Sequence, residues 1–177
     1  MIIRGLTRSD VGELAGLFGR LSDRDITVIR ENVHDLERTE RLADAADLRW
    51  VAVADGGRVV GYAAVNRLPG WSDHVGELRL VVEPSLRRSG IGRKLSQRAL
   101  RGAFTVGIRK VVIELATNEE AVLEMFSRLG FTGEALLRNH IRDRDGALRD
   151  LVILAHHADE SWETLRAIGV TEALDEA

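Results

Sequence analysis

The sequence contains no cysteine among its 177 residues. The chain therefore cannot form a disulfide or a thiolate zinc site, and no thiol is available as a nucleophile. It also lacks a long apolar run, since no stretch approaches the ~20 residues that a membrane-spanning helix requires. The N-terminus becomes polar within its first ten residues and predicts no signal peptide. These absences predict a cytoplasmic protein without a membrane partner.

An excess of charge of one sign is also absent. The formal net charge is −3, with 45% apolar and 30% charged residues, which is typical of a globular chain. This balance does not favour nucleic acid as a partner, so any anion site has to be a local cluster of cations. No proline- or serine-rich linker divides the chain. We therefore expect a single domain, with a core over residues 1–156 and a C-terminal helical extension over residues 157–177.

The spacing of apolar residues predicts a mixed α/β or α+β fold. Thr7 followed by Asp10 resembles a helix capping box. In chain order we expect a strand at 2–3, helices over 6–21 and 23–46, a hairpin over 48–68, a strand at 77–82, a helix over 90–106, a strand at 110–116, a helix over 118–129, a hairpin over 133–157 with Asp145–Gly146 at its turn, and a helical tail. This order predicts one sheet that is antiparallel at its start and end, with a strand–helix–strand unit in the middle.

A basic loop with two glycines, LRRSGIGRKL, joins the strand at 77–82 to the next helix. A helix N-terminus presents unpaired backbone N–H groups and a partial positive charge. Gly90 and Gly92 remove the side chains that would keep a diphosphate from that backbone, and Arg87, Arg88 and Arg93 add cationic donors. The loop is therefore predicted to bind an anion, although a helix start with solvated arginines would have the same sequence.

Two common phosphate-binding motifs are excluded. The sequence has no G-x-x-x-x-G-K-[ST], and Leu95 stands where a dinucleotide-binding loop has its third glycine. The pattern that remains is R-x-x-G-x-G over residues 87–92, and a short motif of this kind is weak evidence when it stands alone.

In its context, this loop resembles that of the GNAT superfamily of acyl-CoA-dependent N-acetyltransferases. Four segments follow that family's order: LVVEPSLRRSGIGRKL, VVIELATN, AVLEMFSRLGF and HIRDRDGALRDLVILA. The resemblance covers residues 47–156 well and the first 46 residues loosely. It implies a mostly antiparallel sheet that splays at its middle strands and is flanked by helices.

The resemblance also implies acetyl-CoA as the cosubstrate and no metal. The end of the strand at 77–82 would bond the pantetheine arm, with the N–H of Val82 or Val81 on the thioester carbonyl, and the loop amides would hold the pyrophosphate. The implied cofactor residues are Leu80, Val81, Val82, Arg87, Arg88, Ser89, Gly90, Ile91, Gly92, Arg93, Asn118 and Phe126. A helix N-cap before Glu119 fits Asn118 equally well.

Acetyl transfer to an amine requires a proton acceptor, because an alkylamine with a pKa near ~10.4 is mostly protonated at neutral pH. Glu77 is the candidate, since some relatives place a catalytic glutamate at the start of this strand. The competing interpretation of Glu77 is an exposed strand-end carboxylate paired with an arginine such as Arg79. Asp73, His74 and His140 are weaker candidates for the same role.

One position departs from the family pattern. Many relatives carry a tyrosine before the Gly-Phe pair, which is thought to protonate the leaving thiolate, whereas the two possible alignments place Met125 or Phe126 there. Neither can donate a proton, but a thiol with a pKa near ~8.5 is a fair leaving group without help. Direct attack in a ternary complex is favoured, because no cysteine could carry the acyl group.

The function implied is N-acetylation of a primary amine on a protein lysine, a protein N-terminus or a small molecule. The alternative is a non-catalytic acyl-CoA-binding or sensing module, which the missing tyrosine favours and Glu77 disfavours. Residues 23–46 and 66–76 are expected to frame the acceptor cleft. Trp162 and Leu165 would pack either on the sheet or on a second chain in a homodimer.

Overall fold

The computed structural model describes residues 1–22, 25, 48–142 and 146–158. The helix expected over residues 23–46, apart from Asp25, the turn residue Asp145 and the helical tail from residue 159 lie outside the described residues. Within the part that is described, no helix is long and apolar enough to cross a membrane.

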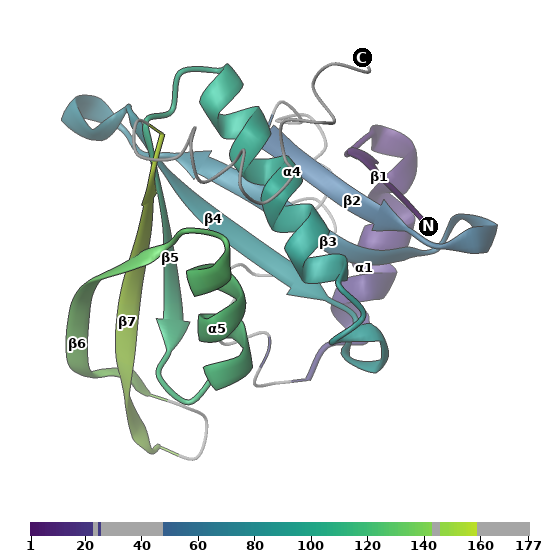
Figure 1. The fold of residues 1–177 in the computed structure, drawn as a ribbon. Helices are drawn as coiled ribbons and strands as arrows, with labels where there is room; N and C mark the ends of the chain where they lie inside the picture. Colours follow the sequence, from purple (N-terminus) through teal and green to yellow (C-terminus); the bar gives the residue numbers. More distant parts are fainter. Residues whose placement is uncertain (23–24, 26–47, 143–145, 159–177) are drawn as a thin grey trace.

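Within the described residues, seven strands form one sheet in the order β1-β2-β3-β4-β5-β7-β6 (Figure 1). Every neighbouring pair is antiparallel except β4 and β5, which are parallel. The strands are β1 (Ile2–Gly5), β2 (Arg49–Val53), β3 (Val59–Arg67), β4 (Val75–Val82), β5 (Lys110–Ala116), β6 (Thr132–Arg142) and β7 (Leu148–His157). The expected sheet is confirmed, including its single strand–helix–strand unit. β7 continues through His157, one residue past the expected end of the core.

Three α-helices in the described residues cover the two faces of this sheet. They are α1 (Val11–Gly19), α4 (Ile91–Thr105) and α5 (Glu120–Arg128). α4 and α5 lie on one face and α1 on the other (Figure 1). α4 is the crossover between the parallel strands β4 and β5, so its first turn lies beside the end of β4.

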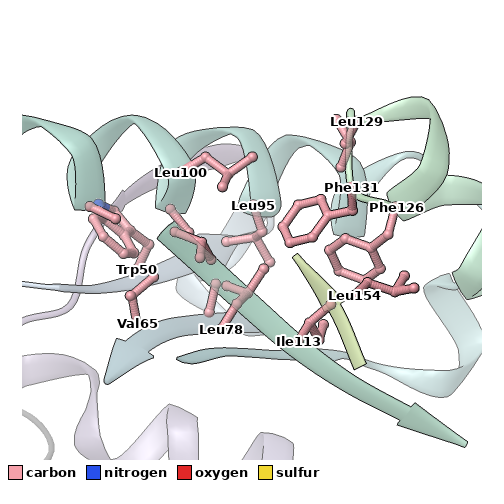
Figure 2. Packing of buried hydrophobic residues seen from close by; sticks show 14 of the residues in the cluster. Trp50, Val65, Leu78, Leu95, Leu100, Ile113, Phe126, Leu129, Phe131 and Leu154 are labelled. Carbon is pink, nitrogen blue, oxygen red and sulfur yellow. The ribbon is translucent and has the colours of Figure 1, made fainter. Parts of the chain in front are cut away.

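The main core lies between the sheet and the helices α4 and α5. Leu95, Ala99 and Leu100 recur at helical spacing on α4 and are buried against β2, β3 and β4. α5 contributes Phe126, which packs edge-on against Phe131 with ring centroids 5.0 Å apart (Figure 2). A second cluster fills the space beneath α1, where the Phe18 and Tyr62 rings make a T-shaped contact at 5.8 Å. The strands β2, β3 and β4 are therefore covered on both faces.

The expected capping box is present and caps the 3-10 turn Arg8–Asp10, which leads directly into α1. The Thr7 amide donates to Asp10 Oδ2 at 2.9 Å, and Arg4 donates to both Asp10 oxygens, each at 2.6 Å. The Asp10 side chain is only 6% exposed. The hydrogen bond from Arg4, with those from Thr7, lowers the pKa of Asp10 to about 2 against the cost of burial. The ion pair ties α1 to β1.

The lowered pKa of Asp10 predicts an acid-dependent loss of stability. Because the folded pKa of about 2 lies below the unfolded value of 3.8, the carboxylate contributes fully above about pH 4, and the contribution is lost as pH falls toward 2. We expect Asp10→Asn to lower the free energy of unfolding by about 2 kcal/mol at pH 6 and by much less at pH 2.5. Urea unfolding between pH 2.5 and pH 6 measures the free energy of unfolding of each variant. The control is Asp55→Asn, because the Asp55 side chain is fully exposed. A difference that does not change with pH would contradict the assignment.

Candidate cofactor and acceptor site

The parallel strands β4 and β5 separate after only three residue pairs. Their register runs from Val75 opposite Lys110 to Glu77 opposite Val112 and then stops, although β4 continues to Val82 and β5 to Ala116. The two strands form a V in Figure 1. Since unpaired main-chain groups of a buried strand need partners, the open part of β4 can pair with a ligand.

The main-chain groups that face this opening are those of Leu80 and Val82. One residue beyond β4, the amide of Glu83 donates a hydrogen bond of 2.9 Å to the carbonyl of Val60 in β3. Because bonded and non-bonded pairs alternate along an antiparallel ladder, Val81 also bonds to β3. The Val81 side chain is buried beneath α1. The expectation that Val81 offers its N–H to the cofactor is therefore wrong, because β3 already uses that group.

The basic loop follows β4 and leads directly into α4. Gly90 is the N-cap of α4 and adopts the left-handed conformation with φ +85°. Its carbonyl accepts the first helical bond, from the Lys94 amide at 3.1 Å. The amides of Ile91, Gly92 and Arg93 consequently have no acceptor within the helix, and the N-cap residue Gly90 has no side chain that could cap them. They form a ready set of anion donors.

Gly92 tests whether the loop fits a ligand that approaches the backbone. An added Cβ at Gly92 would lie 3.6 Å from atoms of Leu80, Val82 and Met125, which is ordinary van der Waals contact. Neither a positive φ nor packing of the protein therefore requires glycine at residue 92. The space that it leaves lies between the open end of β4 and α5. The residues present fit a ligand that runs along β4 to the first turn of α4.

Met125, and not Phe126, borders this space. Phe126 is 0% exposed even with no ligand present and packs against Phe131 in the core. Its ring therefore cannot contact a cofactor without repacking, which corrects the cofactor role expected for it. The Met125 sulfur instead lies near Gly92. Of the two alignments for the missing tyrosine, the one that names Met125 describes the residue at the site.

Arg87 and Arg88 differ in how they are held. Arg87 donates to Asp25 Oδ1 at 2.6 Å and, more weakly, to the Val82 carbonyl at 3.4 Å. Burial favours protonation of Asp25, but hydrogen bonds from Ser22 and from Arg87 outweigh it, so the pKa of Asp25 lies below its usual value. Arg88 adopts a left-handed φ of +63°, a strained conformation for a side-chain-bearing residue.

The remaining loop and turn residues lie around the same opening. Ser89 is exposed, and its hydroxyl donates to the Leu86 carbonyl at 2.6 Å, which tightens the turn before Gly90. Asn118 lies exposed in the turn after β5. The N-cap of α5 is Glu119, so the alternative interpretation of Asn118 as the N-cap is wrong.

Glu77 lies where β4 and β5 part, on the sheet face opposite α4. It is the third residue of β4 and the last to be paired with β5. Its Oε1 is 2.7 Å from Arg79 Nη2, and the two side chains are only 17% and 15% exposed. The expected pairing with Arg79 is confirmed, but Glu77 is neither exposed nor at the strand end. A half-buried carboxylate at this position is suited to accept a proton.

The weaker candidates for the proton acceptor lie farther from the opening. Asp73 and His74 are exposed and precede β4, at the end of the sheet where β4 and β5 are still paired. His140 is exposed on the edge strand β6, within a break in its pairing to β7. The geometry favours Glu77 over all three.

Three polar side chains on the same sheet face were not singled out from the sequence, although Asn66 belongs to the range 66–76 that was expected to frame the acceptor cleft. Arg49 of β2 donates to Asn66 Oδ1 of β3 at 3.1 Å, and Asn66 lies opposite Glu77. Glu114 lies two residues beyond Val112 on β5, so it projects from the same face. A charged residue inside an otherwise apolar strand, as in VVIELA, is the signal that could have revealed Glu114. Among the described residues, no three His, Asp or Glu side chains could hold a metal ion together.

Sequence comparison places this arrangement in a family. A model of the acetyltransferase (GNAT) family matches residues 20–131. The chain belongs to this family. It is 32% identical over 97 residues to the N-alpha-acetyltransferase RimI of Mycobacterium tuberculosis, which covers 52% of this chain and 58% of RimI. The chain spans about half the length of the first two curated relatives it matches, 46% and 58%.

Solved GNAT structures share the fold. A ribosomal-protein-alanine N-acetyltransferase from Brucella melitensis has a TM-score of 0.79 at 21% identity, covering 89% of this chain and 99% of that one. YncA from Salmonella typhimurium, solved with acetyl-CoA, has a TM-score of 0.78 at 20% identity, covering 91% of this chain and 95% of YncA. The expected GNAT membership and fold are therefore confirmed.

A glycine substitution in the GNAT loop separates ligand contact from backbone strain. Gly90 and Gly57 both have a φ of +85°, and a Cβ at either would meet nothing within 4 Å. We expect Gly90→Val and Gly57→Val to lower stability similarly, by about 1 kcal/mol or more. Only Gly90→Val should weaken CoA binding, at least tenfold, because only that side chain blocks the amides of α4. Titration calorimetry measures the affinity of each variant for CoA. Equal affinities for the two variants would contradict the assignment of the loop to the cofactor.

Proposed function

We propose that the protein is an acetyltransferase that moves an acetyl group from acetyl-CoA to a primary amine in a ternary complex. The observation that carries this proposal is the opening between β4 and β5, which exposes main-chain groups of Leu80 and Val82 beside the uncapped first turn of α4. Membership in the GNAT family and the acetyl-CoA in the YncA structure support the choice of cosubstrate.

In this proposal the chain binds acetyl-CoA by two sets of backbone groups. Leu80 and Val82 pair with the pantetheine arm as a neighbouring strand would, and the amides of residues 91–93 hold the diphosphate. Arg87, Arg88 and Arg93 add cationic donors around the loop. When bound, acetyl-CoA supplies a thioester whose carbonyl carbon is open to attack.

Glu77 provides the proton acceptor. The acceptor amine arrives mostly as an ammonium ion and must lose a proton before it can attack. The carboxylate of Glu77 lies where the two strands part, 2.7 Å from Arg79. Glu77 takes the proton directly or through one water and returns it to solvent. Water can protonate the leaving thiolate, since Met125 has no proton to give.

One observation favours a second function, an acyl-CoA-binding module without catalysis. Met125 borders the site and Phe126 is buried in the core, so neither can act as the proton donor that many GNAT enzymes have. The two functions differ in one measurable respect. A binding module would bind acetyl-CoA without releasing CoA thiol in the presence of any amine.

Removing the charge of Glu77 tests the catalytic proposal. We expect Glu77→Gln to lower kcat by 10²–10⁴-fold, the usual range for a general base, with CoA affinity changed less than about threefold. Thiol release in the presence of an amine panel measures kcat, and calorimetry measures affinity. The matched control is Glu134→Gln, which removes another strand carboxylate that is ion-paired, with Lys110, but lies on β6. An unchanged kcat for Glu77→Gln would remove Glu77 from the mechanism.

A further inference from the structure

The sheet face beneath α1 carries opposite charges on its two sides. Arg49 on β2 and Arg79 on β4 are both opposite Ala64 of β3, so the short Ala64 side chain separates two arginines. Glu77 and Glu114 lie toward β5, around the point where the strands part. Arg49 and Arg79, on either side of Ala64, form the cationic side, and Glu77 and Glu114 form the anionic side. The two sides meet on β4, where Arg79 and Glu77 are ion-paired.

The four residues belong to one face because side chains alternate along a strand. On β2, β3 and β4 the intervening residues Trp50, Val65 and Leu78 all point into the core beneath α4. The face is apolar beneath α1, where Tyr62 and Val81 are buried, and becomes polar beyond it. Charged side chains that are half-buried on β2, β4 and β5 are costly to keep without function.

Arg79 has more donors than its contact with Glu77 uses. A guanidinium carries five N–H donors in a fixed fork. Within the described part of the chain, Arg79 makes one ion pair, through Nη2, and its buried Nε has no hydrogen-bond partner. A buried donor of this kind is expected to have a partner. A carboxylate is the group that matches an arginine fork best.

We infer that the acceptor is a small amino acid, a molecule with both a primary amine and a carboxylate. The inference rests on the proposed acetyl transfer and names the substrate class of the same site. The amine lies on the anionic side, near Glu77 and the opening that receives the thioester. The carboxylate lies toward Arg79 and Arg49. The same two arginines disfavour a polyamine or a lysine-rich peptide, because they repel additional cations.

The reaction on such an acceptor balances without a further reagent. The ammonium group loses one proton to Glu77, which passes it to solvent. The amine nitrogen then forms a bond to the acetyl carbon, the bond from that carbon to sulfur breaks with its electron pair leaving on the CoA thiolate, and the nitrogen loses a second proton. This second proton passes through water to the thiolate. The products are an N-acetyl amino acid, which keeps its carboxylate, and CoA.

Matched acceptors test this inference with the wild-type protein. α-, β- and γ-Amino acids are each compared with their own carboxamide, which keeps the amine and loses the negative charge, alongside spermidine and a lysine peptide. We expect kcat/KM for at least one amino acid to exceed that of its carboxamide at least tenfold, as charged hydrogen bonds allow. Calorimetry on the protein–CoA complex with the same pairs should show the same preference in binding.

Arginine variants assign the preference to this sheet face. We expect Arg79→Gln and Arg49→Gln each to reduce the ratio of kcat/KM between amino acid and carboxamide at least tenfold, with Arg79→Lys retaining part of it. The control is Arg138→Gln, which removes an exposed arginine from β6 and should leave the ratio unchanged. Thermal unfolding identifies any variant that does not fold. If Arg79→Gln does not fold, Arg49→Gln still decides the question.

Failure of the inference and failure of the proposed function give different results. Acetylation of carboxamides, spermidine or the lysine peptide as fast as any amino acid would overturn the inference and keep the acetyltransferase. Variants that leave the ratio unchanged would also overturn it. CoA binding with no thiol release on any acceptor would instead reject the proposed catalysis.

Discussion

The structure depends on a pair of parallel strands that separate before they end. β4 and β5 share three register pairs and then diverge, so the last residues of β4 keep main-chain groups without a strand partner. An interior strand with unsatisfied groups is unfavourable unless something else pairs with them. The crossover helix α4 begins beside the same groups with free amides of its own. The gap in the ladder and the start of α4 therefore supply the two halves of the proposed cofactor site.

The two faces of the sheet have different proposed roles at the point where β4 and β5 separate. On the α4 and α5 face, Leu80, Val82 and Met125 give the proposed cofactor path an apolar wall next to the backbone donors. On the α1 face, Glu77 and Arg79 provide charged side chains from the same part of β4. Because adjacent residues of a strand point to opposite faces, β4 alone can serve the cofactor with one set of residues and the acceptor with the other.

Much of the site could be predicted from the sequence because its signals are local. The glycines at 90 and 92, the arginines around them and the hydrophobic periods on either side specify a strand, a loop and a helix within some 30 residues. The errors concern properties that depend on distant partners. Val81 differs from Val82 only in which neighbour its amide faces, and Phe126 differs from Met125 only by a rotation of about 100° around α5. The polar row from Arg49 to Glu114 joins four strands, and which of their residues share a face depends on the register between the strands.

The amino-acid sequence by itself determined the class of fold, the order of the elements and the position of the glycine-containing basic loop at 87–93. These follow from side-chain period and from backbone conformations that particular residue types permit. Tertiary structure alone decided where β4 and β5 part, which main-chain groups remain unpaired, and which charges share a face with Glu77. The physical reason is that pairing and facing are set by strand register, and register results from packing the whole sheet between α1 and the α4–α5 layer.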